Sequence, residues 1–412
     1  MTVQANSGSA ATWALAAAQL VAWGAIYYAF SLFVVPMESA MGWSRTATNA
    51  ALSVGLLVSG LAAWPVGVWI DRGHGRQIMT WGSVLATAML ALWSQAHSLT
   101  TLFIAWIGLG VAMAATLYDP VFAIITRNFP GSFRKRITLI TLVGGFASTV
   151  FIPLTHGFVD SLGWRDALLA LAAINLAICV PLNGLAIGRH TAHTDRTDHK
   201  TAIRRDNAAG TQRALRTPTF WALVVCFTAY YATFAALTFH LVPLLTERNV
   251  APAVVIATMA VIGPAQVLAR ILWFTIGRKV RPSAMGMVIT TAFPASVVIL
   301  MLAGKSPVLL ILFAIVYGGA NGMMTILRGT IVQDVMWTEG YGAVSGLLSM
   351  PSNVAKGIAP ISAAAIWSIG RDYVPVECAV LLVSLVSAAA FVVAMRLAGN
   401  ERRRSFEQSA SG

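Results

Sequence analysis

The chain has 412 residues, of which 57% are hydrophobic and 10% charged, with a net charge of +13 and a mean hydropathy of +0.73. This composition leaves too little polar surface for a soluble protein of this length. The 28 basic residues are split among separate loops, which argues against a nucleic-acid-binding protein and favours anionic lipid as their partner.

Twelve stretches are long and apolar enough to cross a bilayer as a helix, which takes about 20 predominantly apolar residues. They cover residues 12–35, 47–70, 77–96, 99–126, 137–159, 166–188, 219–246, 252–277, 283–303, 307–329, 341–368 and 374–398. The first is about twice as long as the apolar core of a signal peptide and has no small-residue cleavage site, so it is expected to remain as the first helix. The sequence therefore predicts an all-α polytopic membrane protein.

The loops between these stretches alternate between basic and nearly uncharged. With the N-terminus inside, 20 of the 28 basic residues fall on the cytoplasmic side and five fall on the opposite side. An excess of Lys and Arg in short loops marks the cytoplasmic face. The pattern therefore predicts an inner-membrane protein with both termini in the cytoplasm.

The most polar part of the chain lies between the sixth and seventh apolar stretches. The predicted organisation is an N-terminal six-helix bundle at 1–188, a cytoplasmic linker at 189–218, a C-terminal six-helix bundle at 219–398 and a cytoplasmic tail at 399–412. The linker is too charged and too poor in apolar residues to fold by itself. Its His190, His193 and His199 have no cysteine partner, so a solvated linker is favoured over a metal tract.

The turn after the second stretch has the features of a gate. It reads GVWIDRGHGR from Gly67 to Arg76, and a degenerate copy without the acidic residue, GRKVR at 277–281, follows the eighth stretch. Glycine at 67 lets a neighbouring helix approach closely, and Gly73 and Gly75 permit positive backbone angles. The acidic side chain can pair with either arginine or with the positive end of a nearby helix. The candidate gating residues are Gly67, Asp71, Arg72, Gly75 and Arg76, and the alternative is an ordinary positive-inside glycine turn.

Gly67–Arg76 resembles the signature that the major facilitator superfamily carries between its second and third helices, and Gly163-Trp164-Arg165 resembles its common turn before the sixth helix. The plan of six plus six helices covers the entire chain. The resemblance implies two pseudo-symmetric six-helix bundles around a central cavity that opens alternately to each side. It also implies that the first, fourth, seventh and tenth helices line the path.

Two motifs of proton-coupled exporters in this superfamily are replaced here. Ile104 stands where they often carry an arginine, four residues before the Gly-x-Gly pair at 108 and 110, and Gly144-Gly145 with the later Pro153 does not reproduce their fifth-helix signature. The chain is instead similar to monocarboxylate-transporter-like members around Phe239–Glu247 and again at Ile262-Gly263 with Arg270. Gln266 stands where those members often have an aspartate.

Ionisable side chains at bilayer depth are the main candidates for a functional site, because each costs several kcal/mol unless it is paired or hydrated. Four such residues stand out: Asp119, Arg270, Arg328 and Lys356. Lys356 is read as a fixed cation facing the cavity, with a hydrogen bond to helix carbonyls or to Asn353 as the alternative. Arg328 lies near the inner surface, where snorkelling to the headgroups explains it equally well.

Arg270 and Gln266 are four residues apart and so share a helix face. Together with Lys356, this arginine would attract an anionic or strongly electronegative substrate. The alternative is that Arg270 neutralises an acid such as Asp334 at the inner rim.

Asp119 is the candidate proton-coupling residue, because it is the sole carboxylate clearly embedded in an expected cavity helix. It follows Tyr118 and precedes Pro120, where the helix must lose a backbone hydrogen bond. The equally weighted alternative is a structural partner for Arg127 or for the basic turn after the second stretch.

Aromatic and amide side chains recur every four residues on three expected cavity helices and share a face on each. Together with the cations they form the candidate substrate-binding set: Lys356, Arg270, Gln266, Trp23, Tyr27, Tyr230, Phe234, Tyr317 and Asn321, with Gln19 on the same face as the first two aromatics. Packing against neighbouring helices is the alternative reading of these stripes.

The sequence offers no motif for catalysis: it has no phosphate-binding glycine loop, HExxH or GxSxG, and no carboxylate pair placed for hydrolysis. Cys179, Cys226 and Cys378 lie in apolar stretches without CxxC spacing and are read as packing residues, so no metal or cofactor is expected. The sequence predicts a monomeric secondary active transporter of a small solute, with H+ as coupling ion. The cations favour an organic anion such as a carboxylate; the alternative, which the aromatic stripes allow, is efflux of drug-like, metabolite or metalloid toxicants.

Overall fold

The computed structural model describes residues 2–186, 210–276, 280, 282–336 and 341–410, and these residues form helices and turns without a strand. The chain divides into two units, one of Met1–Ala209 with Glu339–Met350 and the other of Gly210–Thr338 with Pro351–Gly412. We call these unit 1 and unit 2. The helix α15 (Tyr341–Gly370) belongs to both, because the division falls between Met350 and Pro351.

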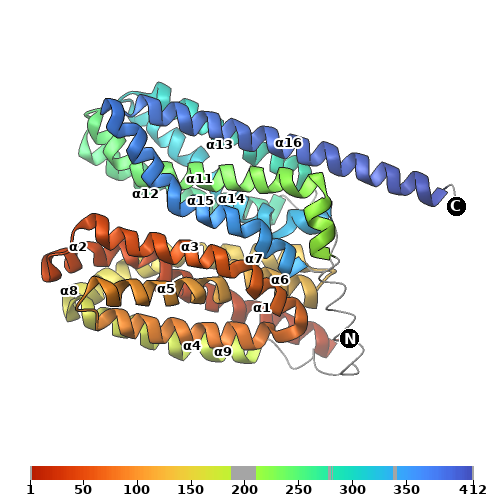
Figure 1. The fold of residues 1–412 in the computed structure, drawn as a ribbon, viewed down its shortest axis with the longest axis horizontal. Coiled ribbons are helices and arrows are strands. Elements are labelled where there is room, and N and C mark those ends of the chain that lie inside the picture. Colours follow the sequence, from red (N-terminus) through yellow and green to blue (C-terminus); the bar gives the residue numbers. More distant parts are fainter. Residues whose placement is uncertain (1, 187–209, 277–279, 281, 337–340, 411–412) are drawn as a thin grey trace. The chain divides into compact units, whose positions relative to one another are not determined.

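Unit 1 is built from helices that run side by side (Figure 1). They are α1 (Thr2–Ala22), η1 (Trp23–Tyr28), α2 (Phe30–Met41), α3 (Arg45–Trp69), η2 (Ile70–His74), α4 (Gly75–Ser94), α5 (Leu99–Thr116), α6 (Tyr118–Asn128), α7 (Phe133–Gly144), α8 (Ala147–Ile174), η3 (Asn175–Cys179) and α9 (Val180–Ala186). Helix α5 packs between α3 and α4, and α1 packs on α7.

A cluster of large aromatic side chains fills part of the core of unit 1. The rings of Phe33 and Trp93 are 5.2 Å apart between centroids, and those of Trp93 and Trp106 are 5.1 Å apart, both edge to face. Edge-to-face pairs at such distances add to the burial of apolar area. These contacts join α2, α4 and α5.

Several of the expected crossings in unit 1 are interrupted rather than continuous. The stretch expected at 99–126 is broken at Leu117, whose ψ of −157° separates α5 from α6. The first crossing contains a π-helical segment at Trp23–Tyr28. Gly73 (φ 92°) and Gly163 (φ 79°) take left-handed backbone angles at two turns, which glycine adopts without strain.

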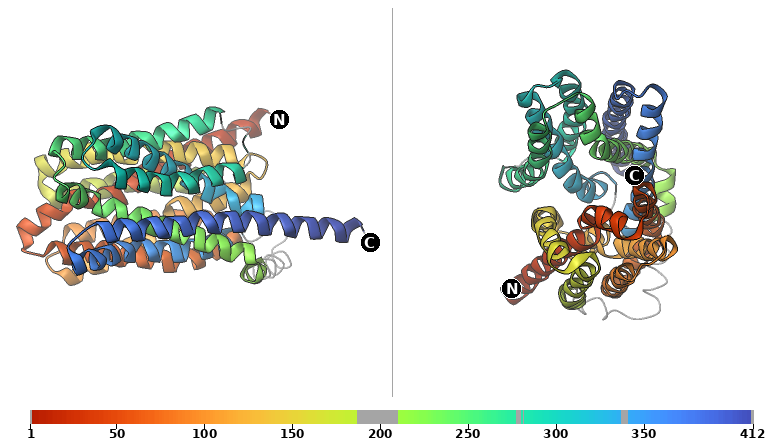
Figure 2. Two further views of the ribbon diagram at one scale, coloured as in Figure 1. Left: turned by 90° about the horizontal axis from the view of Figure 1, so that it is seen from above. Right: turned by 90° about the vertical axis from the view of Figure 1, so that its left-hand side faces the viewer.

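Unit 2 contains α11 (Pro218–Glu247), α12 (Pro252–Ile276), α13 (Pro282–Ala303), α14 (Pro307–Val335), the second part of α15, and α16 (Val374–Ala410). Helix α14 packs against α12 and α13, and α16 packs against α11 and α13. The last part of α16 extends past the other helices of its unit (Figures 1 and 2). Residues 399–410, expected as a tail, continue this helix.

Two arginines donate hydrogen bonds to the carboxyl ends of corresponding helices, α4 and α13, which are the third membrane crossing of each half of the chain. In unit 1, Arg165 donates to the carbonyls of Ser94 (2.5 Å) and Ala96 (3.0 Å) at the end of α4. In unit 2, Arg248 donates to the carbonyl of Leu300 near the end of α13 at 2.9 Å. A cation at a carboxyl end of a helix satisfies free carbonyls and interacts favourably with the helix dipole.

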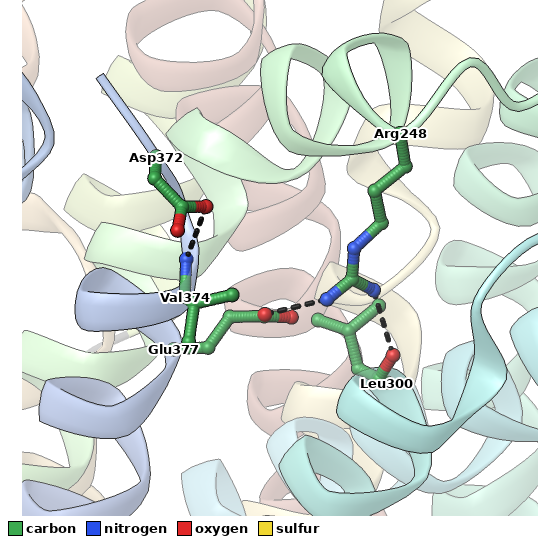
Figure 3. Close-up of polar contacts among 5 residues, drawn as sticks. All are labelled: Arg248, Leu300, Asp372, Val374 and Glu377. Atoms are coloured by element: carbon green, nitrogen blue, oxygen red, sulfur yellow. Dashed lines mark hydrogen bonds and ion pairs between the residues drawn. The ribbon is translucent and has the colours of Figure 1, made fainter. Parts of the chain in front are cut away.

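The second of these arginines also forms a buried ion pair (Figure 3). Its Nη2 lies 2.5 Å from Oε2 of Glu377, whose side chain is 2% exposed. Asp372 accepts from the backbone N–H of Val374 at 3.1 Å and so caps the start of α16. The pair of Arg248 and Glu377 therefore ties the end of α11 to α16.

Nine helical stretches among the described residues are long and apolar enough to cross a membrane. Two of them, Ala47–Ser94 and Phe133–Leu185, each cover one of the twelve expected crossings and most of the next. The eleventh expected crossing corresponds to the 30-residue α15, which is not among these nine stretches. It contains Lys356, Asn353, several serines and two prolines, which lower its hydropathy. Most of the expected linker at 189–218, with its three histidines, and four of the five residues of the degenerate copy at 277–281 lie outside the described residues.

Candidate functional site

Two cations lie close to one aromatic ring inside unit 2. Nζ of Lys356 on α15 lies 4.1 Å from the ring centroid of Tyr231 on α11, and Cζ of Arg328 on α14 lies 5.4 Å from the same centroid. Three helices thus converge on this ring. The negative face of an aromatic ring attracts cations without neutralising them. We call Tyr231, Arg328 and Lys356 the cation cluster.

The Lys356 side chain is half-buried, and its Nζ lies 3.3 Å from Oδ1 of Asn353. This is the contact expected under the alternative reading of the sequence. An ammonium group has three donors, and the contact with Asn353 uses one of them. The contact with Asn353 is therefore compatible with an ionic ligand at the same nitrogen.

Of the two readings of Arg328, the structure favours a buried position inside unit 2. Its side chain is only 8% exposed, so it is not extended into the headgroup region as snorkelling would require. Sequence reasoning recognised its charge at depth but not Tyr231 as its neighbour. Tyr231 lies directly after the predicted stripe residue Tyr230, and nothing in its spacing marks it as the point where three helices meet.

Arg270 on α12 is 4% exposed, and its Nε donates to the carbonyl of Gly322 on α14 at 3.1 Å. One turn away, Gln266 accepts from Nδ2 of Asn321 at 3.1 Å. The predicted pair on α12 therefore faces α14. The close approach is possible because Gly322 has no side chain: a Cβ there would lie 2.5 Å from the carbonyl oxygen of Gln266.

The predicted aromatic residues of unit 2 pack against one another. Phe234 stacks on Tyr317 at 5.0 Å, and Tyr230 lies 4.8 Å from Phe293, which in turn lies 5.4 Å from Tyr317. Tyr317 is fully buried and donates to the carbonyl of Phe234 at 2.9 Å. The packing alternative thus describes their contacts, and they form a rigid layer joining α11, α13 and α14.

In unit 1 the predicted aromatic residues also meet. The ring of Trp23 lies 5.3 Å from Tyr27 and 5.0 Å from Tyr118 on α6. Gln19, on the same face of the first crossing, is buried and donates to the carbonyl of Thr116 at 2.6 Å. Asp119 follows Tyr118 in the first turn of α6 and is half-buried.

The carboxylate of Asp71 binds the amino end of α15 within unit 1. Its Oδ1 accepts from the N–H of Gly342 at 2.9 Å and its Oδ2 from the N–H of Ala343 at 2.7 Å. These are free backbone donors at the positive end of a helix. Of the partners expected for Asp71, the structure thus has the helix end. Arg127, at the end of α6, donates to the carbonyls of Ile70 and Asp71.

The glycines of this turn have different roles. A Cβ at Gly67 would lie 2.0 Å from the carbonyl oxygen of Gly342, so the expected close approach is present. Gly73 has the expected positive φ, but the same expectation for Gly75 was wrong. Gly75 starts α4 with φ −53°, and a Cβ there would lie 2.8 Å from Ile124. Arg72 is exposed and Arg76 half-buried.

The bundles of long apolar helices, with cations held at depth, define a polytopic membrane protein. The sequence profile of the Major Facilitator Superfamily matches residues 15–360, and the chain belongs to this superfamily. The all-α fold and the class of membrane transporter expected from the sequence are thereby confirmed.

Two curated relatives are monocarboxylate transporters. Rat monocarboxylate transporter 13 is 26% identical over 343 residues, which is 81% of this chain and 76% of the rat protein. Mouse monocarboxylate transporter 11 is 30% identical over 173 residues, which is 40% of this chain and 37% of the mouse protein. The similarity to this group that the sequence suggested is confirmed.

Two solved structures share the fold. The proton:xylose symporter XylE, bound to 6-bromo-6-deoxy-D-glucose, has a TM-score of 0.74 at 10% identity and covers 95% of this chain and 96% of its own. The human organic anion transporter MFSD10 has a TM-score of 0.65 at 14% identity and covers 95% of this chain and 98% of its own. At these identities the likeness concerns the fold.

Proposed function

We propose that this protein is a secondary active transporter of a small organic anion, such as a monocarboxylate, and that the cation cluster binds the anionic group. The observation that carries the proposal is that Lys356 and Arg328 both lie close to the ring of Tyr231. Two cations beside one ring make this part of unit 2 electropositive. A carboxylate would bind there in preference to a neutral solute.

The other predicted residues of unit 2 support the cluster in this proposal. Arg270 adds a third cation, which is buried, and the contact of Gln266 with Asn321 fixes α12 against α14. The stacked rings of Phe234 and Tyr317 hold α11 against α14, from which Tyr231 and Arg328 project. Trp23 and Tyr27 of unit 1 are proposed as substrate-binding residues of that unit, from the face they share on the first crossing.

The names of the relatives agree with this substrate class. Two curated relatives are monocarboxylate transporters, and one structural neighbour is an organic anion transporter. The chain shares Arg270 with the monocarboxylate-transporter-like pattern but has Gln266 where an aspartate often stands. With a neutral amide at 266, the positive charge of Arg270 is available to an anion.

Transport is proposed to proceed by alternating access, with the turn of Gly67, Asp71, Arg72, Gly75 and Arg76 as a gate. The two hydrogen bonds from the amino end of α15 to Asp71 support this role, because they hold α15 and the turn together until a movement breaks both. The same segment of α15 leads into the part that carries Lys356. Gate and substrate cation therefore lie on one helix.

We assign proton coupling to Asp119. Asp119→Asn should abolish accumulation driven by a proton gradient while sparing exchange of internal for external substrate, because the asparagine cannot release a proton. Accumulation and exchange are measured separately in proteoliposomes. Unaltered pH dependence of transport in this variant would remove Asp119 as the proton carrier.

The orientation in the membrane is proposed from the basic loops, with both termini in the cytoplasm of the cell and the protein in the inner membrane. A cysteine introduced at Thr201, in a variant without the three native cysteines, should react with an impermeant maleimide only after the cells are opened. A cysteine at Lys305 should react in intact cells. The reverse result would invert the assignment.

The substrate class is tested with Lys356→Gln and Lys356→Arg in sealed vesicles, using short-chain monocarboxylates as probes. Lys356→Gln should raise the KM for these anions, because it removes a charge, and Lys356→Arg should retain much of the binding. Arg270→Gln tests the second cation in the same way. Unchanged anion transport in both glutamine variants, with intact protein in the membrane, would discard the anion and favour the rival, efflux of apolar or metalloid toxicants.

A further inference from the structure

His240 joins two helices of unit 2 at the end of α11. Its Nε2 lies 2.9 Å from the carbonyl oxygen of Pro360 on α15, and its Nδ1 lies 3.1 Å from the hydroxyl oxygen of Tyr373, between α15 and α16. The imidazole is half-buried. A second contact joins the same two helices: Nε1 of Trp367 donates to Oε2 of Glu247 at 2.9 Å.

The two partners determine where the protons of this ring lie. A backbone carbonyl only accepts, so Nε2 must carry hydrogen and donate to Pro360. In the neutral ring, Nδ1 is then an acceptor, and the hydroxyl of Tyr373 donates to it. Burial, together with the nearby carboxylate of Glu247, raises the pKa of Tyr373 above its ordinary value near 10, so this hydroxyl keeps its proton at neutral pH.

The junction lies where both helices lack a backbone hydrogen bond. Pro243 on α11 cannot donate to the carbonyl of Phe239, and Pro360 on α15 cannot donate to the carbonyl of Lys356. His240 is the residue after Phe239, and its side chain binds the carbonyl of Pro360. Lys356 and Pro360 are four residues apart and so lie on one face of α15.

The charged and titratable groups near this junction come from each neighbouring element. They are Glu247 on α11, Arg248 in the turn after it, Lys356 on α15, Arg371, Asp372 and Tyr373 between α15 and α16, and Glu377 on α16. Glu377 is paired with Arg248, and Glu247 is exposed and accepts from Trp367. The direct polar contacts of the imidazole in unit 2 are Pro360 and Tyr373.

We propose that His240 is a second proton-binding site, and that its protonation strengthens the hold of α11 on the segment of α15 that carries Lys356. The role in transport rests on the proposed function, whereas the protonation itself does not. Histidine is the side chain that ordinarily exchanges a proton between pH 5 and 8. Neither Asp119 nor the gate turn belongs to this unit.

The protonation step requires little rearrangement. A proton from water adds to the lone pair of Nδ1, and the hydroxyl of Tyr373 rotates so that its oxygen becomes the acceptor. The bond from Nε2 to Pro360 remains and becomes charge-assisted, which makes it shorter and stronger. The ring gains one positive charge on the same helix pair as Lys356, which increases the attraction for an anion.

The proton-binding site is tested without any transport measurement by NMR of protein labelled with 15N in the imidazole rings. Comparison with His240→Gln identifies the signals of this ring. We expect the neutral ring to be the Nε2–H tautomer and to take up one proton at Nδ1 as the pH is lowered. A neutral ring protonated at Nδ1, or a ring that stays neutral at every pH at which the protein is folded, would overturn the proposal.

The consequence for transport is tested by the pH dependence of the KM for a monocarboxylate in proteoliposomes. His240→Gln keeps an amide donor for Pro360 but cannot titrate, so the change of KM between pH 5 and 8 should shrink to less than about twofold. His97→Gln, at an exposed histidine of unit 1, should keep the wild-type profile. Tyr373→Phe separates the roles of the two partners, because it removes the hydroxyl and leaves Nε2 bonded to Pro360.

Retention of the full pH profile in His240→Gln would refute coupling of this proton to transport. Thermal unfolding of each variant shows whether the protein remains folded. If Lys356→Gln leaves anion transport unchanged while His240 titrates as expected, the proposed substrate fails and the proton-binding site stands.

Discussion

The side-chain amide of Gln19 donates a 2.6 Å hydrogen bond to the backbone carbonyl of Thr116, which lies four residues before Pro120. Proline has no N–H, so the usual partner of this carbonyl in a helix is missing. Gln19 supplies the donor in its place. The polar residue of the first crossing thus has a structural role at the break between α5 and α6.

Replacement of Gln19 by leucine should lower the free energy of unfolding by about 1–3 kcal/mol, because a buried carbonyl loses its donor. A thiol-reactive dye that reports exposure of the buried Cys179 and Cys226 on heating measures the change. Equal melting temperatures for wild type and Gln19→Leu would contradict this role.

Replacement of Gly67 by valine should abolish most of the transport activity. Its Cβ would fall 2.0 Å from the carbonyl oxygen of Gly342, so α15 could not approach α3. Transport in proteoliposomes and the amount of folded protein are measured together. Gly157→Ala is the control, since no atom lies within 4 Å of a Cβ there, and comparable activity of the two variants would argue against the close approach.

Tyr231→Leu should weaken binding of an anionic substrate, whereas Tyr231→Phe should retain it. Both cations of the cluster lose the ring face in the leucine variant, and such contacts contribute about 0.5–2 kcal/mol. This corresponds to roughly 2- to 30-fold in affinity. Binding is measured by thermal shift of purified protein against monocarboxylates. Equal affinities in the two variants would show that the ring face does not position the cations.

Arg248→Ala should destabilise the protein by about 3–5 kcal/mol, because it leaves Glu377 charged and buried without its partner. Thermal unfolding of the detergent-purified protein gives the value. The double variant Arg248→Gln with Glu377→Gln should be considerably more stable than Arg248→Ala, since no buried charge remains. A loss of the same size in both would assign the effect to the bond with Leu300 instead.

The extent to which the sequence predicted this molecule depends on the range of the interactions. Apolar length identified the crossings, and Gly67, Gly73 and Asp71 were recognised because a close approach, a positive φ and an acidic group at a helix end each require a particular residue type. Gly75 was misread, because its constraint is the neighbouring Ile124 rather than its backbone angle.

The cation cluster could not be predicted, because Tyr231, Arg328 and Lys356 come from three helices whose rotation about their axes is not encoded in local spacing. Hydrophobic periodicity shows which face of a helix is buried. It does not show which other helix supplies the partner. For the same reason the contacts of His240 could not be predicted, because its two partners lie 120 and 133 residues further along the chain. In the sequence it is one polar residue in an apolar stretch.

Helix α15 passes from unit 1 to unit 2 between Met350 and Pro351. The proline at this junction, like Pro360 further along, deprives a carbonyl (here that of Leu347) of its usual backbone donor, which makes the helix easier to bend there. Its first turns are held by Asp71, while its later turns carry Lys356 and receive His240. One helix with a proline in its middle thus connects the proposed gate at Asp71 with the proposed anion site at Lys356. Breaking the hydrogen bonds at its first turn therefore need not move its later turns as a rigid body.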